Sequence, residues 1–368
     1  MSLLRSWSRF FRLKLQRFGS SGAVFNPAFL DYTETVGFGL RMFAARWVFA
    51  LTRGVLSSFA GMSMLCMVGP VSGADSSKVV RVGYQKSGAL LLTKSSGLLE
   101  KALAPVGYSV AWKEFPSGLP LLEALNGGSI DIGHSGDAPL LFAQAAGISF
   151  QVFAASNPSP ESTGVVVPKD SSIHSFAELK GKKVAFSKGS SAHLVVAELL
   201  AREGMTFADI KPVYLEPPDA RAAFEAKAVD AWAIWDPFLA AAEVEGGGRM
   251  IVNGAGLSGH REFYFGRADF LKANPGVVDV VMAALADTGR SAKNDPKATA
   301  DFLAGKLGIT PAVMERSELR KQRYFAQPMT AEIVSEQQTG ADIFFRLGLM
   351  PKAIRVADIV FKSHTSTP

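Results

Sequence analysis

Three short polar turns in this chain carry residue types that could bind a small ligand. Each turn lies between a β-rich run and a helical pattern, and together they contain Gln85 and Ser87; Ser135, Gly136 and Asp137; and Gly189, Ser190, Ser191 and His193. Hydroxyls and free backbone N–H groups at the start of a helix suit an anion. Taken alone, each turn is also explained by helix capping or by an ordinary connection between a strand and a helix. The binding interpretation therefore depends on the turns acting together.

An aromatic candidate follows another predicted strand. Trp235 lies just past the strand end, where its ring could offer an alkyl chain a flat apolar wall; packing between helices is the alternative. Asp236, the next residue, could hold the geometry of a cleft or meet a cationic group of a ligand. Trp232 is expected to lie in a core.

No catalytic or metal-binding pattern accompanies these turns. The histidines are scattered, without the paired spacing of a metal site: His134, His174, His193, His260 and His364. A Walker phosphate loop and the nucleophile elbow of serine hydrolases are also absent from the sequence. We therefore expect no catalytic residue, no metal and no cofactor, and interpret His193 as a helix-face residue near a cleft.

The elements that must position these turns alternate between β-rich and helical segments, which predicts parallel α/β structure. Strands are expected at 79–84, 109–115, 130–133, 150–154, 164–167, 183–186, 213–215 and 231–234. Helices are expected at 90–103, 120–126, 138–146, 176–179, 192–203 and 219–226, and after Glu262 at 277–293, 297–307, 312–319 and 333–347. Open α/β sheets bind ligands at the carboxyl ends of their strands, so two such blocks imply a cleft between two lobes.

The net charge of +6 is confined to the first part of the chain. Residues 1–74 contain eight basic and two acidic groups, which gives 8 − 2 = +6, and the remainder has 31 of each sign. A strongly basic nucleic-acid-binding face is therefore not expected on the body of the protein.

The leader has the pattern of an export signal. Arg46 and Arg53 precede an apolar, small-residue run at 54–71 that ends in small residues, which predicts cleavage between Ala74 and Asp75. A buried or membrane-spanning helix is the alternative, but a Gly-Pro pair interrupts the run. Because the signal lies far from residue 1, translation could start at Met42, or residues 3–18 could form a membrane-surface helix or an organellar address.

The single cysteine, Cys66, lies inside this leader. A mature chain without cysteine has no thiol catalysis, disulfide or cysteine metal site. The bulky Leu65 before Cys66 does not match a lipoprotein anchor.

From about Val79 to Val360 the chain resembles the aliphatic sulfonate-binding proteins of ABC importers, in the superfamily of the taurine, nitrate and pyrimidine-precursor receptors. The matching stretches are Gly83 to Lys86, Glu114 to Pro116, Leu122 to Asn126, Gly128 to Asp131, Ser135 to Asp137, Phe142 to Gly147, Leu179 to Gly181, Val184 to Phe186, Lys188 to Ser191, Asp219 to Phe224 and Asp230 to Pro237. Departures at 87–89 and at His134 leave the preferred chain length open.

This resemblance implies a type II periplasmic-binding-protein fold, with two α/β lobes joined by crossings near Val167 and Phe263. The expected division is a leader at 1–74, lobe I at 75–167 and 263–368 with the C-terminal helices, and lobe II at 168–262. The resemblance also implies that the cleft is surrounded by Gln85, Ser135, Gly136, Asp137, Ser190, Ser191, His193 and Trp235.

The function expected from the resemblance is the capture of an aliphatic sulfonate in the periplasm, by a monomer that hands it to a separate permease and ATPase in the inner membrane. A sulfonate spreads its charge over three oxygens, so neutral Ser, Gly and Gln donors can match it. Two rivals stay open: a receptor for taurine, nitrate or a thiamine-pyrimidine precursor, and a pyrimidine-synthase-like enzyme, which the scattered histidines and the export signal oppose.

Overall fold

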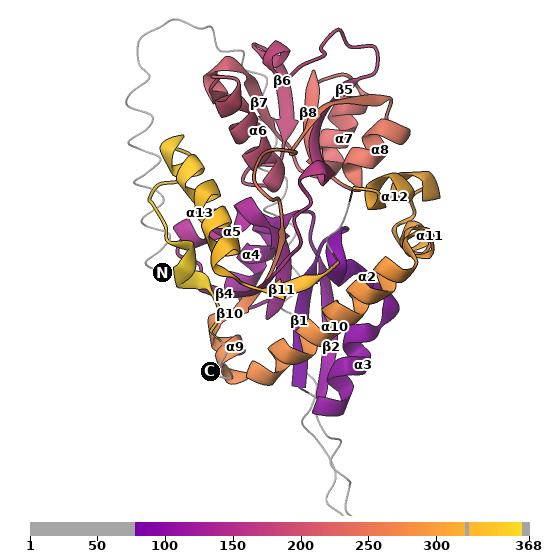
Figure 1. The fold of residues 1–368 in the computed structure, drawn as a ribbon, viewed down its shortest axis with the longest axis vertical. Coiled ribbons are helices and arrows are strands. Elements are labelled where there is room, and N and C mark those ends of the chain that lie inside the picture. Colours follow the sequence, from indigo (N-terminus) through magenta and orange to yellow (C-terminus); the bar gives the residue numbers. More distant parts are fainter. Residues whose placement is uncertain (1–77, 321–323, 363–368) are drawn as a thin grey trace, which may run out of the picture. The chain divides into compact units, whose positions relative to one another are not determined.

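The computed structural model describes residues 78–320 and 324–362 (Figure 1). The expected leader, with its cleavage site after Ala74, lies outside the described residues, as do Met42 and Cys66. In the part of the chain that is described, no helix combines the length and the apolar character needed to cross a bilayer.

The first of two sheets has six strands in the order β11-β4-β10-β3-β1-β2. Their bounds are β1 Lys78–Tyr84, β2 Tyr108–Glu114, β3 Ile132–Gly136, β4 Phe150–Ser156, β10 Glu262–Arg267 and β11 Ala326–Pro328. β1 pairs in parallel with β2 and β3, whereas β10 runs antiparallel to both β3 and β4. The central strands are buried along most of their length, as expected for a sheet covered on both faces.

The second sheet has five strands in the order β7-β6-β8-β5-β9. Their bounds are β5 Thr163–Pro168, β6 Lys183–Phe186, β7 Lys211–Tyr214, β8 Ala231–Trp235 and β9 Gly248–Asn253. β6 is parallel to β7 and β8, and β5 is antiparallel to β8 and β9.

Both sheets are therefore mixed, which corrects the expectation of purely parallel structure. The chain passes from the first sheet to the second between β4 and β5, at residues 157–162, and returns between β9 and β10, at 254–261. The expected first crossing near Val167 is wrong, because the strand that contains Val167 pairs within the second sheet. The strands that follow each crossing, β5 and β10, run antiparallel to their neighbours, as does β11 beside β4.

Helices lie against both sheets (Figure 1). Their bounds are α2 Gly88–Ser96, α3 Leu98–Leu103, α4 Gly118–Asn126, α5 Asp137–Ala145, α6 Ser191–Arg202, α7 Pro217–Glu225, α8 Phe238–Val244, α9 Ala268–Ala273, α10 Pro275–Asn294, α11 Pro296–Leu307, α12 Pro311–Glu318 and α13 Ala331–Arg346. The single helix expected at 90–103 is broken into α2 and α3 at Gly97, whose φ of 66° is accessible to glycine at little cost.

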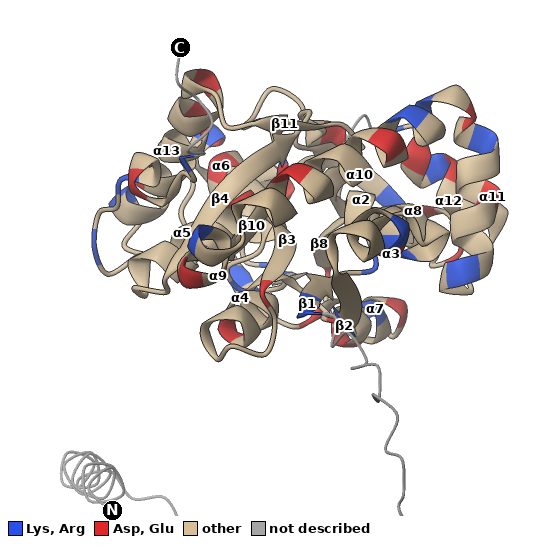
Figure 2. Ribbon diagram, turned by 90° about the horizontal axis from the view of Figure 1, so that it is seen from below, with Lys and Arg blue, Asp and Glu red and all other residues tan. Residues whose placement is uncertain are grey.

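The C-terminal helices pack against helices on the sides of both sheets. The division expected from the sequence assigned them to the first lobe alone, whereas their contacts reach both sides. Val313 of α12 packs in one cluster with Ala240 and Ala241 of α8. Phe344 of α13 packs with Leu141 of α5 and Leu194 of α6. Figure 2 shows acidic and basic residues interspersed over α10, α11 and α12, in keeping with the balanced charge of this part of the chain.

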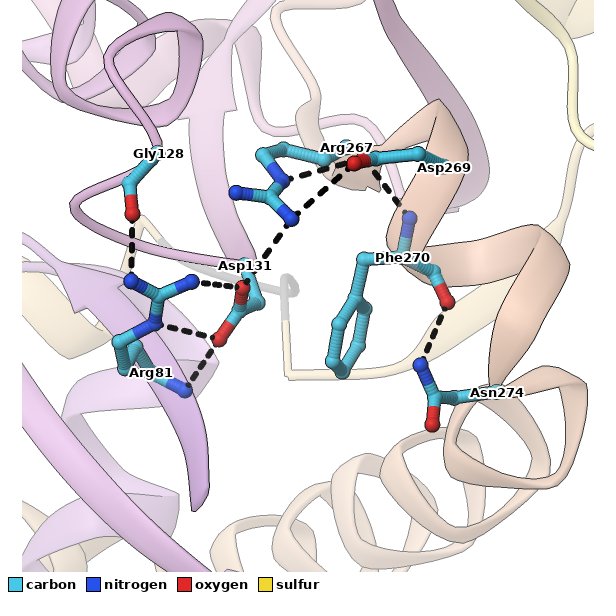
Figure 3. Close-up of polar contacts among 7 residues, drawn as sticks. All are labelled: Arg81, Gly128, Asp131, Arg267, Asp269, Phe270 and Asn274. Carbon is cyan, nitrogen blue, oxygen red and sulfur yellow. Dashed lines mark hydrogen bonds and ion pairs between the residues drawn. The ribbon is translucent and has the colours of Figure 1, made fainter. Parts of the chain in front are cut away.

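A charged cluster stabilises the first sheet (Figure 3). Asp131, in the turn before β3, accepts hydrogen bonds from Nε of Arg81 at 2.9 Å and from Nη2 at 2.6 Å, and Arg267 of β10 lies 3.9 Å from the same carboxylate. Asp131 is buried, so this pairing satisfies a charge that would otherwise be costly. The contacts link β1, the start of β3 and β10, and they explain the acidic residue in the stretch Gly128 to Asp131.

Candidate functional site

A cavity lies between the two sheets, where loops at the ends of their strands meet. The six-stranded side supplies Gln85, Ser87, Gly118, His134, Ser135, Gly136 and Pro139; the five-stranded side supplies Thr163, Ser190, Ser191 and Trp235; and His260, Arg261 and Glu262 come from the return crossing and the start of β10. The lining is mostly polar and contains several neutral hydroxyl and amide groups.

Four helices begin at residues that line this cavity. Ser87 precedes α2, Gly118 is the first residue of α4, Gly136 precedes α5 and Ser190 precedes α6. The first N–H groups of a helix have no acceptor within the helix, and the positive end of its dipole lies at the same place. Because four such ends converge, the cavity favours an anion before any cationic side chain is considered.

Two hydroxyls in the cavity wall are available as donors. The Ser135 hydroxyl is buried and has no hydrogen-bond partner among the described residues. Ser87 is also buried, and its side chain makes no capping bond to α2. A buried hydroxyl without a hydrogen-bond partner is energetically costly, so a ligand oxygen at this place would provide the missing acceptor.

The hydroxyl of Ser190 has a different role. It donates to the carbonyl of Ser187 at 2.7 Å and accepts the N–H of His193 at 3.3 Å, which makes Ser190 the N-cap of α6. Its only proton is therefore already committed. In this arrangement its side chain does not offer a donor to the cavity that Ser190 lines, and its expected binding role stays a prediction.

Ser191 lies where the two sides of the cavity touch. A Cβ atom placed on Gly136 would lie 2.1 Å from the Ser191 hydroxyl oxygen, so a larger residue at the end of β3 would displace this hydroxyl of α6. The same hydroxyl faces the carboxylate of Asp137 and, after burial and His260, contributes to the pKa of that group by lowering it.

A buried ionic cluster lies behind this contact. Nδ1 of His260 is 3.1 Å from Oδ2 of Asp137, and Nε2 is 3.5 Å from Oε2 of Glu198 on α6. Burial alone would lower the pKa of His260, but hydrogen bonds and charges from the two carboxylates outweigh it and raise the pKa to about 9. Burial would likewise raise the pKa of Asp137, and His260 reverses this. The cluster joins α5, the return crossing and α6.

The six-stranded side also contains a polar wall that the sequence motifs did not reveal. The backbone N–H of Gln85 donates to Nε2 of His134 at 3.2 Å, and the Gln85 side-chain amide donates to the carbonyl of His134 at 3.1 Å. Nδ1 of His134 lies 3.5 Å from Oε2 of Glu262. These contacts orient Gln85 at the cavity.

The structure brings together seven of the eleven residues proposed from the sequence: Gln85, Ser87, Ser135, Gly136, Ser190, Ser191 and Trp235. It places the other four, Asp137, Gly189, His193 and Asp236, behind the cavity wall rather than on it. Asp137 is in the ionic cluster, and Gly189 donates its N–H to Nδ1 of His193 at 3.1 Å. Asp137 and Gly189 therefore hold neighbouring residues in place without lining the cavity themselves.

His193 and Asp236 are structural residues in the described part of the chain. His193 lies among Phe142, Phe186, Phe207, Tyr214 and Phe344, and burial followed by the charge of Lys188 lowers its pKa to about 4. Asp236 is fully buried; its Oδ1 accepts the N–H of Ala240 at 3.0 Å and lies 3.4 Å from Nη1 of Arg320.

Several lining residues were not proposed from the sequence, namely Gly118, His134, Pro139, Thr163, His260, Arg261 and Glu262. His260, Arg261 and Glu262 immediately precede or begin β10, a strand that was not expected because the following region was interpreted as helical. The signal was present: Phe263, Tyr264 and Phe265 form an aromatic run that ends at a glycine, a pattern typical of a buried strand. Among the described residues, no group of three or more His, Cys, Asp or Glu side chains is arranged to hold a metal ion.

This architecture is similar to that of known proteins. The NMT1/THI5 like family matches residues 107–299. A putative aliphatic sulfonates-binding protein of Escherichia coli is 36% identical over 293 residues, which cover 79% of this chain and 91% of that protein. The solved structure of the alkanesulfonate-binding protein SsuA from Xanthomonas axonopodis pv. citri, bound to MOPS, has a TM-score of 0.73 and 40% identity, and covers 77% of this chain and 98% of that chain.

The fold is also found outside binding proteins. The desulfurization enzyme DSZB has a TM-score of 0.57 over 77% of this chain and 96% of that chain, with 15% identity, which shows a shared fold alone. The more similar relatives are binding proteins. The resemblance inferred from the sequence motifs is thereby confirmed: the chain belongs to the NMT1/THI5-like family, together with the aliphatic sulfonate-binding proteins, and has the type II periplasmic-binding-protein fold.

Proposed function

We propose that this protein is the substrate-binding subunit of an ABC importer and captures aliphatic sulfonates. The observation that carries this proposal is the convergence of four helix N-termini on a cavity that also contains the buried, unpartnered hydroxyl of Ser135. The proposal is supported by the relatives, which are described as aliphatic sulfonate-binding and alkanesulfonate-binding proteins.

The chemistry of the cavity suits a sulfonate. Its negative charge is spread over three oxygens, and each can accept hydrogen bonds from neutral hydroxyl, amide and backbone donors. The one arginine in the lining, Arg261, lies 3.1 Å from the Glu336 carboxylate and donates to the carbonyl of Ser156 at 2.8 Å. Neutral donors and helix ends are therefore the main recognition elements that we assign.

We infer two lobes that close on the ligand. One lobe is built on the six-stranded sheet and the other on the five-stranded sheet, with the crossings at 157–162 and 254–261 as the connections. Donors come from both lobes, so a bound anion stabilises the closed arrangement over an open one. In this proposal the closed form is the one that the permease recognises.

The cellular setting is part of the same proposal. An export signal cleaved near Ala74 would deliver the protein to the periplasm as a monomer, where it would serve a separate membrane permease and ATPase. We assign it a binding role without catalysis, without a cofactor and without nucleic acid.

Calorimetry on the purified protein tests the ligand class. We expect a short alkanesulfonate to bind with a dissociation constant of micromolar order or tighter, equivalent to about −8 kcal/mol. Ser135→Ala removes a donor to a charged ligand, which is worth roughly 1.5 to 3 kcal/mol, so affinity should fall by about tenfold or more. Ser317→Ala is the matched control, because the Ser317 hydroxyl is equally buried and without a partner among the described residues but lies on α12.

The same titrations separate the rival receptors. Taurine, nitrate and a thiamine-pyrimidine precursor should bind more weakly than the alkanesulfonate. Tighter binding of any of these would replace the proposed ligand, and unchanged sulfonate affinity in Ser135→Ala would remove Ser135 from the site.

A further inference from the structure

The ionic cluster of His260, Asp137 and Glu198 is a place where three parts of the chain meet. Asp137 begins α5 beside the six-stranded sheet, Glu198 lies on α6 beside the five-stranded sheet, and His260 belongs to the crossing between β9 and β10. The two carboxylates therefore belong to different lobes of the proposed receptor. The His260 ring lies between them, 3.1 Å from Oδ2 of Asp137 and 3.5 Å from Oε2 of Glu198.

The crossing holds the His260 ring in this position. The backbone of His260 has a φ of 45°, a left-handed conformation that is uncommon for a residue with a side chain and persists where surrounding contacts determine it. Ser258, two residues earlier, donates its hydroxyl to the Glu198 carboxylate, so the crossing is joined to α6 at two points. A Cβ atom placed on Gly254 would lie 2.9 Å from Cδ2 of the ring, so the ring also packs against the beginning of the crossing.

The charged residues that follow His260 have partners of their own. Arg261 lies 3.1 Å from the Glu336 carboxylate of α13, and Glu262, the first residue of β10, lies 3.5 Å from Nδ1 of His134. The charge of the His260 ring is therefore balanced chiefly by the two carboxylates of the cluster. Without a proton on the ring, these two buried carboxylates would face each other without a cation between them.

Separation of the lobes takes at least one carboxylate away from the ring, because the ring cannot stay beside both Asp137 and Glu198 when α5 and α6 move apart. In the closed arrangement burial lowers the pKa of His260, but the two carboxylates outweigh burial and raise the pKa to about 9. In an open arrangement, with more water and fewer carboxylates around the ring, the pKa lies closer to its ordinary value of about 6.5. Between these two pH values, closing therefore transfers a proton from solvent to the imidazole.

We propose that His260 is a positioning residue that couples ligand capture to the uptake of a proton: its imidazolium bridges Asp137 and Glu198 and so holds the two lobes closed around the anion. The inference rests on the proposed function and adds a pH dependence that the ligand cannot cause, because a sulfonate stays ionised throughout this range. The proton also favours the anion directly. An unprotonated ring would leave two uncompensated carboxylates beside the cavity that His260 lines.

Calorimetry on the wild-type protein measures the proton directly. Ethanesulfonate is titrated at pH 8 in Tris and in triethanolamine, two amine buffers that differ in ionisation enthalpy and do not compete for an anion site. The difference in binding heat gives the number of protons taken up. We expect about half a proton or more per ligand, because at this pH the ring is charged mainly in the closed form. The affinity should fall by about tenfold or more between pH 7 and pH 9.

Two variants separate this role from a purely structural one. His260→Gln should take up no proton and should have the same affinity at pH 7 and pH 9, whatever that affinity is. Glu198→Gln is the milder variant, because it keeps the pair of His260 and Asp137 and can still accept the Ser258 hydroxyl. Loss of one carboxylate lowers the pKa of His260 in the closed form, so the uptake at pH 8 should fall to about half of the wild-type value or less.

His174→Gln is the control, because His174 is an exposed histidine between β5 and β6 that does not line the cavity. Its proton uptake and pH profile should equal those of the wild type. A wild type that binds ethanesulfonate without proton uptake, or a His260→Gln variant that still takes up the proton, would overturn the role of His260 and leave the proposed function intact. Absence of ethanesulfonate binding at every pH between 6 and 9 would remove the proposed function and the role of His260 together.

Discussion

Two buried histidines, one on α6 and one beside it, are held in opposite charge states. His193 lies in an aromatic cluster, where burial, followed by the nearby charge of Lys188, lowers its pKa to about 4. Burial acts in the same direction on His260, but Asp137 and Glu198 reverse the effect and raise its pKa to about 9. Both rings are almost inaccessible to solvent. The neighbours of a buried histidine, and not its depth, therefore decide its charge.

The difference also assigns two structural roles behind the cavity. The neutral His193 accepts the N–H of Gly189 and so shapes the loop before α6. The cationic His260 neutralises carboxylates from α5 and α6 and so joins the two sides of the cavity. One residue positions a loop within one lobe, and the other connects the two lobes.

The largest effect is expected from removing the charge of His260. His260→Gln leaves two buried carboxylates without their cation, and breaking a buried ion pair in this way costs about 3 to 5 kcal/mol. Urea unfolding at pH 7, followed by circular dichroism, measures the loss. His174→Gln is the control, because His174 is exposed and should change stability by less than about 0.5 kcal/mol.

The pH dependence of the wild type gives the same test without a mutation. Because the folded pKa of His260 is raised above its unfolded value near 6.5, its contribution is fully present below that pH and is lost as pH rises through about 9. The loss is roughly 3 kcal/mol and should be absent in His260→Gln. An unchanged alkaline limb in that variant would show that His260 is not the titrating group.

The stability at acid pH tests the other histidine, His193, and the expected change in stability is smaller. The folded pKa of His193 is depressed, so its contribution is present above pH 6.5 and is lost as pH falls towards 4. At pH 5 the wild type should have lost about 2 kcal/mol through this group. His193→Phe keeps an aromatic ring in the cluster and removes the titration, so its stability should fall less between pH 7 and pH 5. Parallel acid limbs in the two proteins would contradict the neutral state assigned to His193.

Local patterns in the sequence predicted much of the fold but not the pairing between distant segments. The strand-and-turn units that contain Gln85, Ser135 and Ser191 were placed correctly, because period and turn chemistry are local signals. The antiparallel β10 and the early crossing before Thr163 depend on which strands pair across the chain, and no local pattern encodes that.

The sequence also did not predict which residue of a turn has which role. Ser190 and Ser191 are adjacent and alike, yet one hydroxyl caps α6 while the other faces Asp137 across the cleft. The partners of His260 lie far away in the sequence, at Asp137 and Glu198. Such roles follow from orientation on a folded helix and from contacts between lobes.

The smallest effect is expected at Ser190 and tests the loop role on the His193 side. Ser190→Ala removes the N-cap of α6, which typically costs about 1 kcal/mol, while the backbone N–H groups that face the cavity remain. Because the Ser190 proton already goes to the carbonyl of Ser187, sulfonate affinity should change by less than about threefold, well below the loss expected for Ser135→Ala. Urea unfolding and calorimetry on the same preparation separate the two quantities. A loss of affinity of tenfold or more with unchanged stability would mean that Ser190 turns its hydroxyl to the ligand when the cavity is filled, and that the cap gives way to recognition.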